Sequence, residues 1–214
     1  MALAVNNYKN IIFDLGGVIL NIDYQLTEQA FKNMNCSGFE TNYSKAKQTS
    51  LFDDFETGKI NESGFIDGMK KLFELETDKK SIIDAWNAML LDLPNERLDF
   101  LLRAKKNYRT FLLSNTNETH IRAFEEIISS THGIDSLEPY FERVYFSCRI
   151  GMRKPNAEIF EYVLNENKLN ATETLFIDDS LQHIEGALSC GIHAILLDRN
   201  IQLNQLPQLR HLNR

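Results

Sequence analysis

Three features that would restrict the function of this chain are scarce in its sequence: cysteine, long apolar runs and excess positive charge. Only three cysteines occur, Cys36, Cys148 and Cys190, and they lie far apart. An odd and scattered set argues against a disulfide framework and against a zinc site, because both need clustered or paired cysteines. A reducing cytoplasm is therefore the compartment that we expect.

Apolar stretches are short throughout the sequence. None approaches the roughly 18 residues that indicate a membrane span. Residues 1–10 also lack the basic segment and apolar run that are typical of a signal peptide. We find no internal repeat and no low-complexity segment. A cytoplasmic protein that does not associate with membranes is thus expected.

Positive charge is not in excess, because the formal net charge is -7. This argues against a broad surface for nucleic acid. A small anion can still bind, since a local site can oppose the overall charge. We therefore expect a small-molecule ligand, and the sequence does not distinguish a monomer from a dimer.

The sequence does have the length and the pattern of an α/β protein. Its 214 residues suffice for one sizeable core and a small second unit. Apolar stretches rich in Ile, Leu, Val and Phe alternate with helical patterns, which predicts a doubly wound, mostly parallel, Rossmann-like sheet. The predicted strands are residues 10–14, 109–114, 143–147, 174–178 and 194–198, and the predicted helices are residues 95–106, 119–129, 157–166 and 181–190.

The segment between the first two predicted strands has a different pattern. Amphipathic patterns predict helices at residues 26–34, 43–52, 63–75 and 80–91, and no convincing strand occurs among them. We therefore divide the chain into an α/β core domain and an all-helical cap domain. Because the cap is inserted after the first strand, it is expected to lie over the end of that strand, where it can exclude water and select substrate. The core comprises residues 1–20 and 95–214, and the cap comprises residues 21–94.

Polar residues follow the apolar strands at several points of the sequence. In open α/β sheets, ligands bind beyond the carboxyl ends of the strands, so these residues are expected to meet at one edge. A short loop after the third predicted strand can bring a lysine to the same edge. The residues concerned are Asp14, Gly16, Ser114, Asn115, Lys154, Asp178 and Asp179.

The carboxylates in this set suit a hard divalent cation. Asp14 can bind such an ion through one oxygen while the other attacks an electrophile, and the Gly16 carbonyl can face the same ion. Asp178 and Asp179 offer further oxygen ligands, which favour Mg²⁺ over zinc. The alternatives are structural: Asp14 can cap a turn, and one of the paired aspartates can be the N-cap of the next helix.

The other polar residues can bind an anion. Ser114 and Asn115 offer a hydroxyl and N–H donors, although both residue types are also common in turns. Lys154 is a compact cation that can neutralise a phosphate. Its neighbour Arg153 can do the same, or it can pair with a carboxylate of the cap.

At these residues the chain resembles the haloacid dehalogenase superfamily of hydrolases, over essentially its whole length. The motifs are residues 13–18 (FDLGGV), 112–117 (LLSNTN), 154–155 (KP) and 177–180 (IDDS), in the order and spacing of members with a helical cap after the first motif. Residues 151–155 (GMRKP) and 178–187 (DDSLQHIEGA) are similar to a narrower group. That group includes bacterial α-D-glucose-1-phosphate phosphatases and is close to the phosphatase domain of soluble epoxide hydrolase.

The resemblance implies a Mg²⁺-dependent phosphatase that acts on a small phosphorylated metabolite, such as the sugar phosphate glucose 1-phosphate. Asp14 would attack phosphorus and become phosphorylated, and water would then hydrolyse the aspartyl phosphate. The resemblance implies that the phosphoryl oxygens are held by Ser114, Asn115 and Lys154. It implies that Mg²⁺ is held by Asp14, the Gly16 carbonyl, Asp178 and Asp179.

Gly16 departs from the pattern of the superfamily, because most of its phosphatases have a second aspartate at this position. That carboxylate acts as general acid and base, which is typically worth about 10²–10⁴-fold. Gly16 cannot move a proton, so we expect a preference for leaving groups that need little protonation. Asp23, His120 or a bound water can substitute; the structural alternatives are a helix-start aspartate and a helix-surface histidine.

Two other functions are compatible with parts of the sequence. A metal-free 2-haloacid dehalogenase also lacks the second aspartate, but it needs no cation, so the Asp178–Asp179 pair disfavours it. A non-catalytic sensor of phosphorylated metabolites is supported only by Gly16. A phosphomutase is disfavoured too, because it must shuttle a proton repeatedly at that position.

Overall fold

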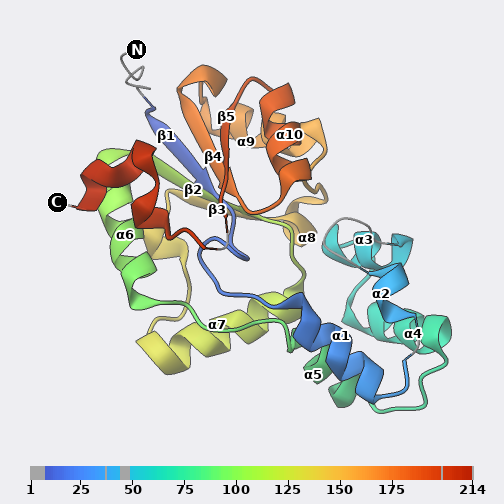
Figure 1. The fold of residues 1–214 in the computed structure, drawn as a ribbon. Coiled ribbons are helices and arrows are strands. Elements are labelled where there is room, and N and C mark those ends of the chain that lie inside the picture. Colours follow the sequence, from blue (N-terminus) through green and yellow to red (C-terminus); the bar gives the residue numbers. More distant parts are fainter. Residues whose placement is uncertain (1–7, 37, 44–48, 199, 214) are drawn as a thin grey trace.

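The computed structural model describes residues 8–36, 38–43, 49–198 and 200–213. Five strands form one sheet in the order β3-β2-β1-β4-β5 (Figure 1), and every pair of neighbours is parallel. This confirms the predicted parallel α/β architecture. The strands are β1 (Asn10–Phe13), β2 (Arg109–Ser114), β3 (Arg143–Phe146), β4 (Thr174–Asp178) and β5 (His193–Leu196).

Helices cover both faces of the sheet. Ile11 and Phe13 of β1 point to the face covered by α6 and α7, whereas Ile12 points to the face covered by α9 and α10. Because both faces are buried, the central strands are apolar at nearly every position, which made them predictable from the sequence. The helices are α6 (Asn95–Asn107), α7 (Glu118–His132), α9 (Ala157–Asn167) and α10 (Leu181–Ser189).

The C-terminal segment adds short helices that the sequence analysis did not predict. Four leucines, Leu203, Leu206, Leu209 and Leu212, are buried in the core cluster on the α6 side of the sheet. Their spacing of three residues matches the 3₁₀ helix, in which every third side chain lies on the same side. The 3₁₀ helices are η1 (Glu138–Tyr140), η2 (Ala171–Glu173), η3 (Leu203–Gln205) and η4 (Pro207–Asn213).

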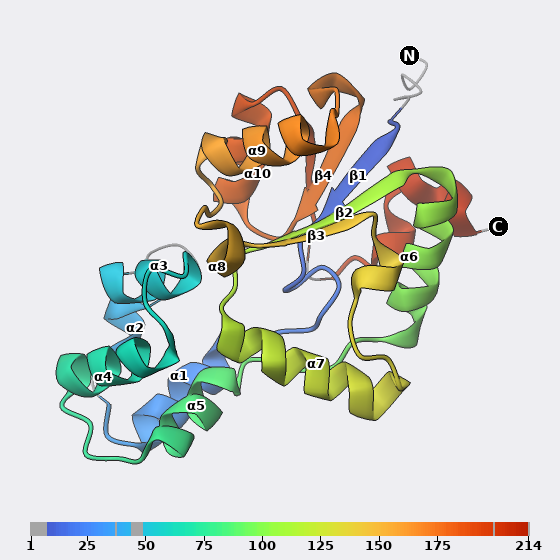
Figure 2. The same cartoon turned by 180° about the vertical axis from the view of Figure 1, so that it is seen from behind.

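Among the described residues between β1 and α6, five helices gather beyond the carboxyl ends of the strands (Figure 2). They bury an aromatic cluster of their own, centred on Phe52, Phe65 and Trp86, which stabilises them separately from the core. The predicted helix at residues 43–52 is only partly described, because residues 44–48 lie outside the described ranges. The helices are α1 (Tyr24–Asn33), α2 (Phe39–Asn42), α3 (Ser50–Glu56), α4 (Glu62–Phe73) and α5 (Lys79–Asn87).

The chain enters and leaves this helical unit through two segments that run side by side. The Asn21 N–H donates to the Asp92 carbonyl at 2.9 Å, and the Leu91 N–H donates to the Asn21 carbonyl at 3.0 Å. Two paired connections of this kind suit a unit that moves as one body, so we retain the division into core (1–20 and 95–214) and cap (21–94) as a proposal. Within the described residues, no helix is both long and apolar enough to span a bilayer.

Candidate active site

The parallel pairing of β1 with β4 brings the first and last acidic motifs together. Phe13 is in register with Ile177, so Asp14 and Asp178 follow on neighbouring strands. Each of Asp14, Asp178 and Asp179 offers one carboxylate oxygen, and these oxygens all lie within 4.8 Å of one another. The three carboxylates are therefore placed to share one ligand.

Lys154 joins the two buried carboxylates. It lies in the loop between α9 and the short helix α8 (Ser147–Ile150), and its side chain is fully buried. Its ammonium is 2.7 Å from Asp14 Oδ1 and 2.7 Å from Asp178 Oδ2. A buried ammonium of this kind is stable because two carboxylates compensate the loss of its hydration.

Burial and charge shift the pKa values of these groups in opposite directions. Burial, with the neighbouring charges of Asp178 and Asp179, raises the pKa of Asp14 to about 7, although Lys154 opposes the shift. Burial also acts to raise the pKa of Asp178, but the Lys154 charge and a hydrogen bond from His183 hold it well below its ordinary value. Two carboxylates beside Asp14 therefore leave the site short of positive charge.

The donor set fits a magnesium ion. Magnesium prefers hard oxygen ligands, and it is usually bound through a small number of carboxylates. Asp14, Asp178 and Asp179 supply three such oxygens in one place, and burial, together with the charges of the other two carboxylates, raises the pKa of Asp14. Gly16 lines the same pocket, at the turn that follows β1.

Asp179 also explains the glycine next to Gly16. Gly17 has φ +76°, and a Cβ atom at this position would collide with the Asp179 carboxylate. A side chain at residue 17 would thus displace a predicted metal ligand. Glycine is required there both for its backbone conformation and for space.

Asn115 fixes the position of the lysine through the backbone. Its side-chain amide donates to the Lys154 carbonyl at 2.9 Å, and its side-chain oxygen accepts from the Lys154 N–H at 2.9 Å. The predicted contact with an anion would therefore have to use the Asn115 backbone N–H. Ser114, at the end of β2, is buried and lines the pocket.

His183 and Ser180 hold the buried Asp178, and the sequence analysis assigned no role to either residue. The Ser180 N–H donates to Asp178 Oδ1 at 2.8 Å, and His183 Nδ1 lies 3.0 Å from Oδ2. His183 follows Asp178 by five positions, in the first turn of α10, so its ring reaches back to the strand end. Aspartate and histidine at this spacing were a usable signal in the sequence.

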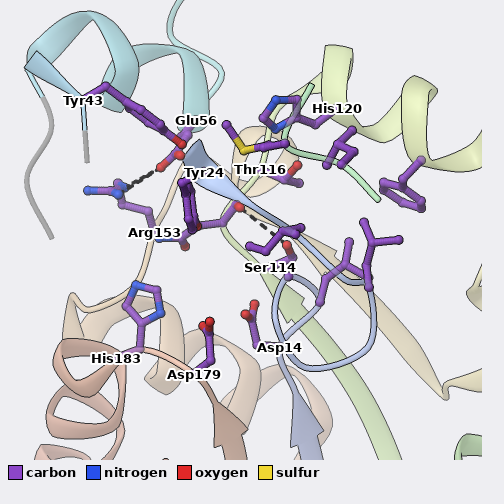
Figure 3. Close-up of a pocket in the computed structure, with 18 residues that line it drawn as sticks. Asp14, Tyr24, Tyr43, Glu56, Ser114, Thr116, His120, Arg153, Asp179 and His183 are labelled. Atoms are coloured by element: carbon purple, nitrogen blue, oxygen red, sulfur yellow. Dashed lines mark hydrogen bonds and ion pairs between the residues drawn. The ribbon is translucent and has the colours of Figure 1, made fainter. Parts of the chain in front are cut away.

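Arg153 pairs with the cap. Its guanidinium contacts Glu56 at 2.9 Å (Figure 3) and Asp53 at 2.9 Å, and both carboxylates belong to α3. The sequence left two roles open for Arg153, neutralising a phosphate or pairing with a carboxylate of the cap. In the structure Arg153 pairs with carboxylates of the cap. The ion pair links the loop that carries Lys154 to the helical unit above it.

The sequence also left the roles of Asp23 and His120 open, and the structure shows where both side chains lie. Asp23 is the N-cap of α1, because its side chain accepts from the Gln25 N–H at 3.0 Å. His120 is buried, stacks on Trp86 with ring centroids 4.8 Å apart, and bonds to the Trp86 carbonyl. It is therefore not the helix-surface histidine of the structural alternative. Burial lowers the pKa of His120 to about 4, so its ring is neutral at pH 7.

The pocket above the carboxylates has one polar side and one apolar side. The polar side is lined by Tyr24, Tyr43, Glu56, Arg153 and His183 (Figure 3). The sequence analysis missed the first three, because no motif marks them and they reach the site only through the docking of the cap. The apolar lining consists of Leu15, Leu20, Ile22, Met89, Leu90 and Phe124.

The chain is similar in sequence to a family of hydrolases and to known phosphatases. Residues 8–191 match the family model described as haloacid dehalogenase-like hydrolase. D-ribitol-5-phosphate phosphatase of Bacteroides thetaiotaomicron is 32% identical over 176 residues, which cover 82% of this chain and 85% of the relative. A sesquiterpene phosphatase of Aspergillus oryzae is 26% identical over 204 residues, covering 94% and 96%.

A solved structure is similar over nearly the whole chain. It is the crystal structure of a haloacid dehalogenase family enzyme from Bacteroides thetaiotaomicron, an aspartate-to-alanine variant in complex with magnesium and inorganic phosphate. The TM-score is 0.87 at 31% sequence identity, and the match covers 97% of this chain and 99% of the other. The likeness therefore includes both the sheet and the helices above it.

Proposed function

Because this chain belongs to the family of haloacid dehalogenase-like hydrolases, we propose that it is a Mg²⁺-dependent phosphatase of small phosphorylated metabolites. One observation carries the proposal: the buried Lys154 ammonium lies between Asp14 and Asp178, with the Asp179 carboxylate beside them. This arrangement supplies a nucleophile, a positive charge for a phosphoryl group and oxygen ligands for a cation. Magnesium is the cofactor, in keeping with the magnesium complexes of similar enzymes.

The substrate class that we propose is a phosphate monoester of a polyhydroxylated compound, either a sugar or a sugar alcohol. The narrower resemblance suggested glucose 1-phosphate, whereas the relative with 32% identity is a phosphatase of D-ribitol 5-phosphate. Both compounds carry one phosphate on a carbon skeleton that bears several hydroxyl groups. The class therefore includes both compounds, and the pocket lining, with tyrosines and a carboxylate, suits it.

The first chemical step is an in-line attack by Asp14. A carboxylate oxygen forms a bond to phosphorus while the bond from phosphorus to the leaving oxygen breaks, so that Asp14 carries the phosphoryl group. The Lys154 ammonium neutralises charge on the phosphoryl oxygens, and the Ser114 hydroxyl donates to one of them. When bound by the three carboxylates, magnesium supplies further positive charge to the same oxygens.

The second step returns Asp14 to its starting state. Water attacks phosphorus, the bond to the aspartate oxygen breaks, and inorganic phosphate leaves. The Asn115 side chain keeps Lys154 in place through both steps, because it holds the lysine backbone by two hydrogen bonds. Preorganised charge of this kind needs no rearrangement as the reaction proceeds.

The first step leaves an alkoxide that must gain a proton. Gly16 has no side chain to supply one, and a Cβ there would come within 2.9 Å of the end of the Ile22 side chain. In this proposal the proton comes from water in the pocket. The preference for good leaving groups stays a prediction, which rates on sugar 1-phosphates and on alditol phosphates will test.

The direct test is phosphate release from a panel of sugar and sugar-alcohol phosphates, with Mg²⁺ or with a chelator. We expect turnover that requires Mg²⁺ and that is abolished in Asp14→Asn. Asp84→Asn is a matched control, because Asp84 lies exposed on α5 of the cap. Release of halide from 2-haloacids without Mg²⁺ would indicate the dehalogenase, and tight phosphate binding without turnover would indicate the sensor.

A further inference from the structure

One wall of the pocket is built to bind uncharged polar groups. Glu56, at the end of α3, is only 6% exposed and yet lines the pocket, where it pairs with Arg153 at 2.9 Å. Tyr43, at the end of α2, is 8% exposed and points to the same pair (Figure 3). Tyr24, the first residue of α1, lies between these residues and the carboxylates of the core (Figure 3).

This wall carries more negative than positive charge. Arg153 is its one cation among the described lining residues, and it contacts two carboxylates, Glu56 and Asp53. Burial and the nearby carboxylates raise the pKa of Tyr24 and of Tyr43, so both hydroxyls keep their protons. The wall therefore offers two hydroxyls and a carboxylate, and it offers little positive charge to a second anionic group.

A second part of the pocket wall is apolar. Its side chains include Leu20, Ile22, Met89 and Phe124, which cannot form hydrogen bonds with a ligand. A compound that fits both walls has hydroxyls along one edge and carbon-bound hydrogens along the other. Sugars and sugar alcohols have this character, whereas prenyl chains lack the hydroxyls.

We propose that Tyr24, Tyr43 and Glu56, with Arg153 as the partner that holds Glu56, select the leaving group by binding its hydroxyls. The inference deepens the proposed function and rests on it. The phosphate is held by the core, and the hydroxyl-bearing carbon chain extends along the wall that the cap supplies. Substrates with a second phosphate or a carboxylate are rejected, because Glu56 repels them at short range. Prenyl phosphates are rejected because they leave the buried polar groups without partners.

The test compares substrates that share the phosphate and differ in the leaving group. The purified full chain with Mg²⁺ is assayed on D-ribitol 5-phosphate and glucose 1-phosphate, on phenyl phosphate, on phosphoglycolate and on farnesyl phosphate. Three variants, Tyr24→Phe, Tyr43→Phe and Glu56→Gln, each change one wall residue and keep its size. Tyr108→Phe is the matched control, since Tyr108 precedes β2 at the far end of the sheet.

D-Ribitol 5-phosphate and glucose 1-phosphate are the two polyol phosphates of this panel. For whichever of them the unaltered chain hydrolyses with the higher kcat/KM, we expect kcat/KM to fall by about 10-fold or more in each wall variant, because each variant removes a buried hydrogen-bonding group. Phenyl phosphate, whose leaving group makes no such bond, should change less than about 2-fold. Glu56→Gln should also raise the rate on phosphoglycolate relative to the polyol phosphate. The control should behave as the unaltered chain.

Three results would overturn the inference. An equal loss on phenyl phosphate and on the polyol phosphates would assign the wall a purely structural role. Unchanged selectivity in the variants would assign the hydroxyls to other residues. If the unaltered chain hydrolyses none of the phosphates, including phenyl phosphate, then the proposed function itself is wrong. That result differs from the second one, in which the enzyme is active but the wall residues do not affect its substrate selectivity.

Discussion

The Lys154 ammonium lies 2.7 Å from Oδ1 of Asp14, although the two residues are 140 positions apart in the sequence. The lysine side of this contact is fully buried, and Asp14 reaches it from the end of β1. Burying a charge pair of this kind costs desolvation free energy, and such pairs occur often at functional sites. In the proposed mechanism, both stability and chemistry at this site depend on this contact.

Replacing this lysine should therefore affect both properties. In Lys154→Met the carboxylates of Asp14 and Asp178 lose their shared cation, and we expect a loss of about 3–5 kcal/mol in the free energy of unfolding. We expect kcat to fall by about 10²–10³-fold, as when one stabilising donor is removed from a transition state. Urea denaturation and steady-state kinetics measure the two effects.

The control is Lys80→Met, at an exposed lysine of the cap, and it should change the stability and kcat little. Equal effects in both variants would contradict this role of Lys154.

Removing one of the proposed metal ligands should weaken magnesium binding without unfolding the chain. In Asp179→Asn one of three carboxylates loses its charge, so we expect the Kd for Mg²⁺ in calorimetric titration to rise by about 10-fold or more. Because magnesium binds only the folded chain, its stabilising effect on the Tm should also shrink. An unchanged Kd would show that Asp179 does not hold the ion. A chelator should abolish turnover of the unaltered chain, and added Mg²⁺ should restore it.

The cap approaches the core closely at Gly58, which follows α3. Gly58 has φ +68°, and a Cβ atom there would collide with the Cys148 carbonyl of the core. Gly58→Ala should therefore destabilise the docked cap and raise KM for the polyol phosphates. Gly133→Ala is the matched control, because Gly133 also has positive φ, at +66°, but has no neighbour within 4 Å of the added atom.

The control should lose only the roughly 1–2 kcal/mol that a left-handed conformation costs a residue with a Cβ atom. If both variants lose the same stability and keep the same KM, then the contact between Gly58 and Cys148 does not set the position of the cap.

Neutral His120 should make stability depend on pH. Burial lowers its pKa from 6.5 to about 4, so between these values the unfolded chain binds a proton that the folded chain does not. Its contribution is fully present above pH 6.5 and is lost as the pH falls toward 4. Unfolding of the wild type and of His120→Phe at pH 7 and pH 5 isolates this term from that of the carboxylates. We expect a smaller loss in His120→Phe, and identical losses would contradict the prediction.

Much of the core was predictable because its signals are local. Asp14 directly follows β1 and Asp178 is the last residue of β4; both strands are buried on both faces, and the apolar runs locate such strands well. The predicted strand at residues 194–198 was displaced relative to β5, His193–Leu196, because an edge strand is paired on one side only and its pattern is weaker. The helices η3 and η4 escape prediction, because their buried leucines recur every three residues, which is the period of neither an α-helix nor a strand.

The cap side of the site was not predictable, for a physical reason. Tyr24, Tyr43 and Glu56 meet Arg153 only when two separately packed units dock, and no periodicity records a docking geometry. Asn115 shows a related limit. The sequence indicates a polar residue at the right strand end, but only the folded structure shows its side chain bound to the Lys154 backbone.

The most direct measurement is the stereochemical course at phosphorus, followed with a chiral thiophosphate ester hydrolysed in isotopically labelled water. Transfer to Asp14 and then to water involves two in-line displacements, each of which inverts the configuration. Net retention is therefore the predicted result. Net inversion would mean that water attacks the substrate directly, and Asp14 would then not be the phosphoryl acceptor.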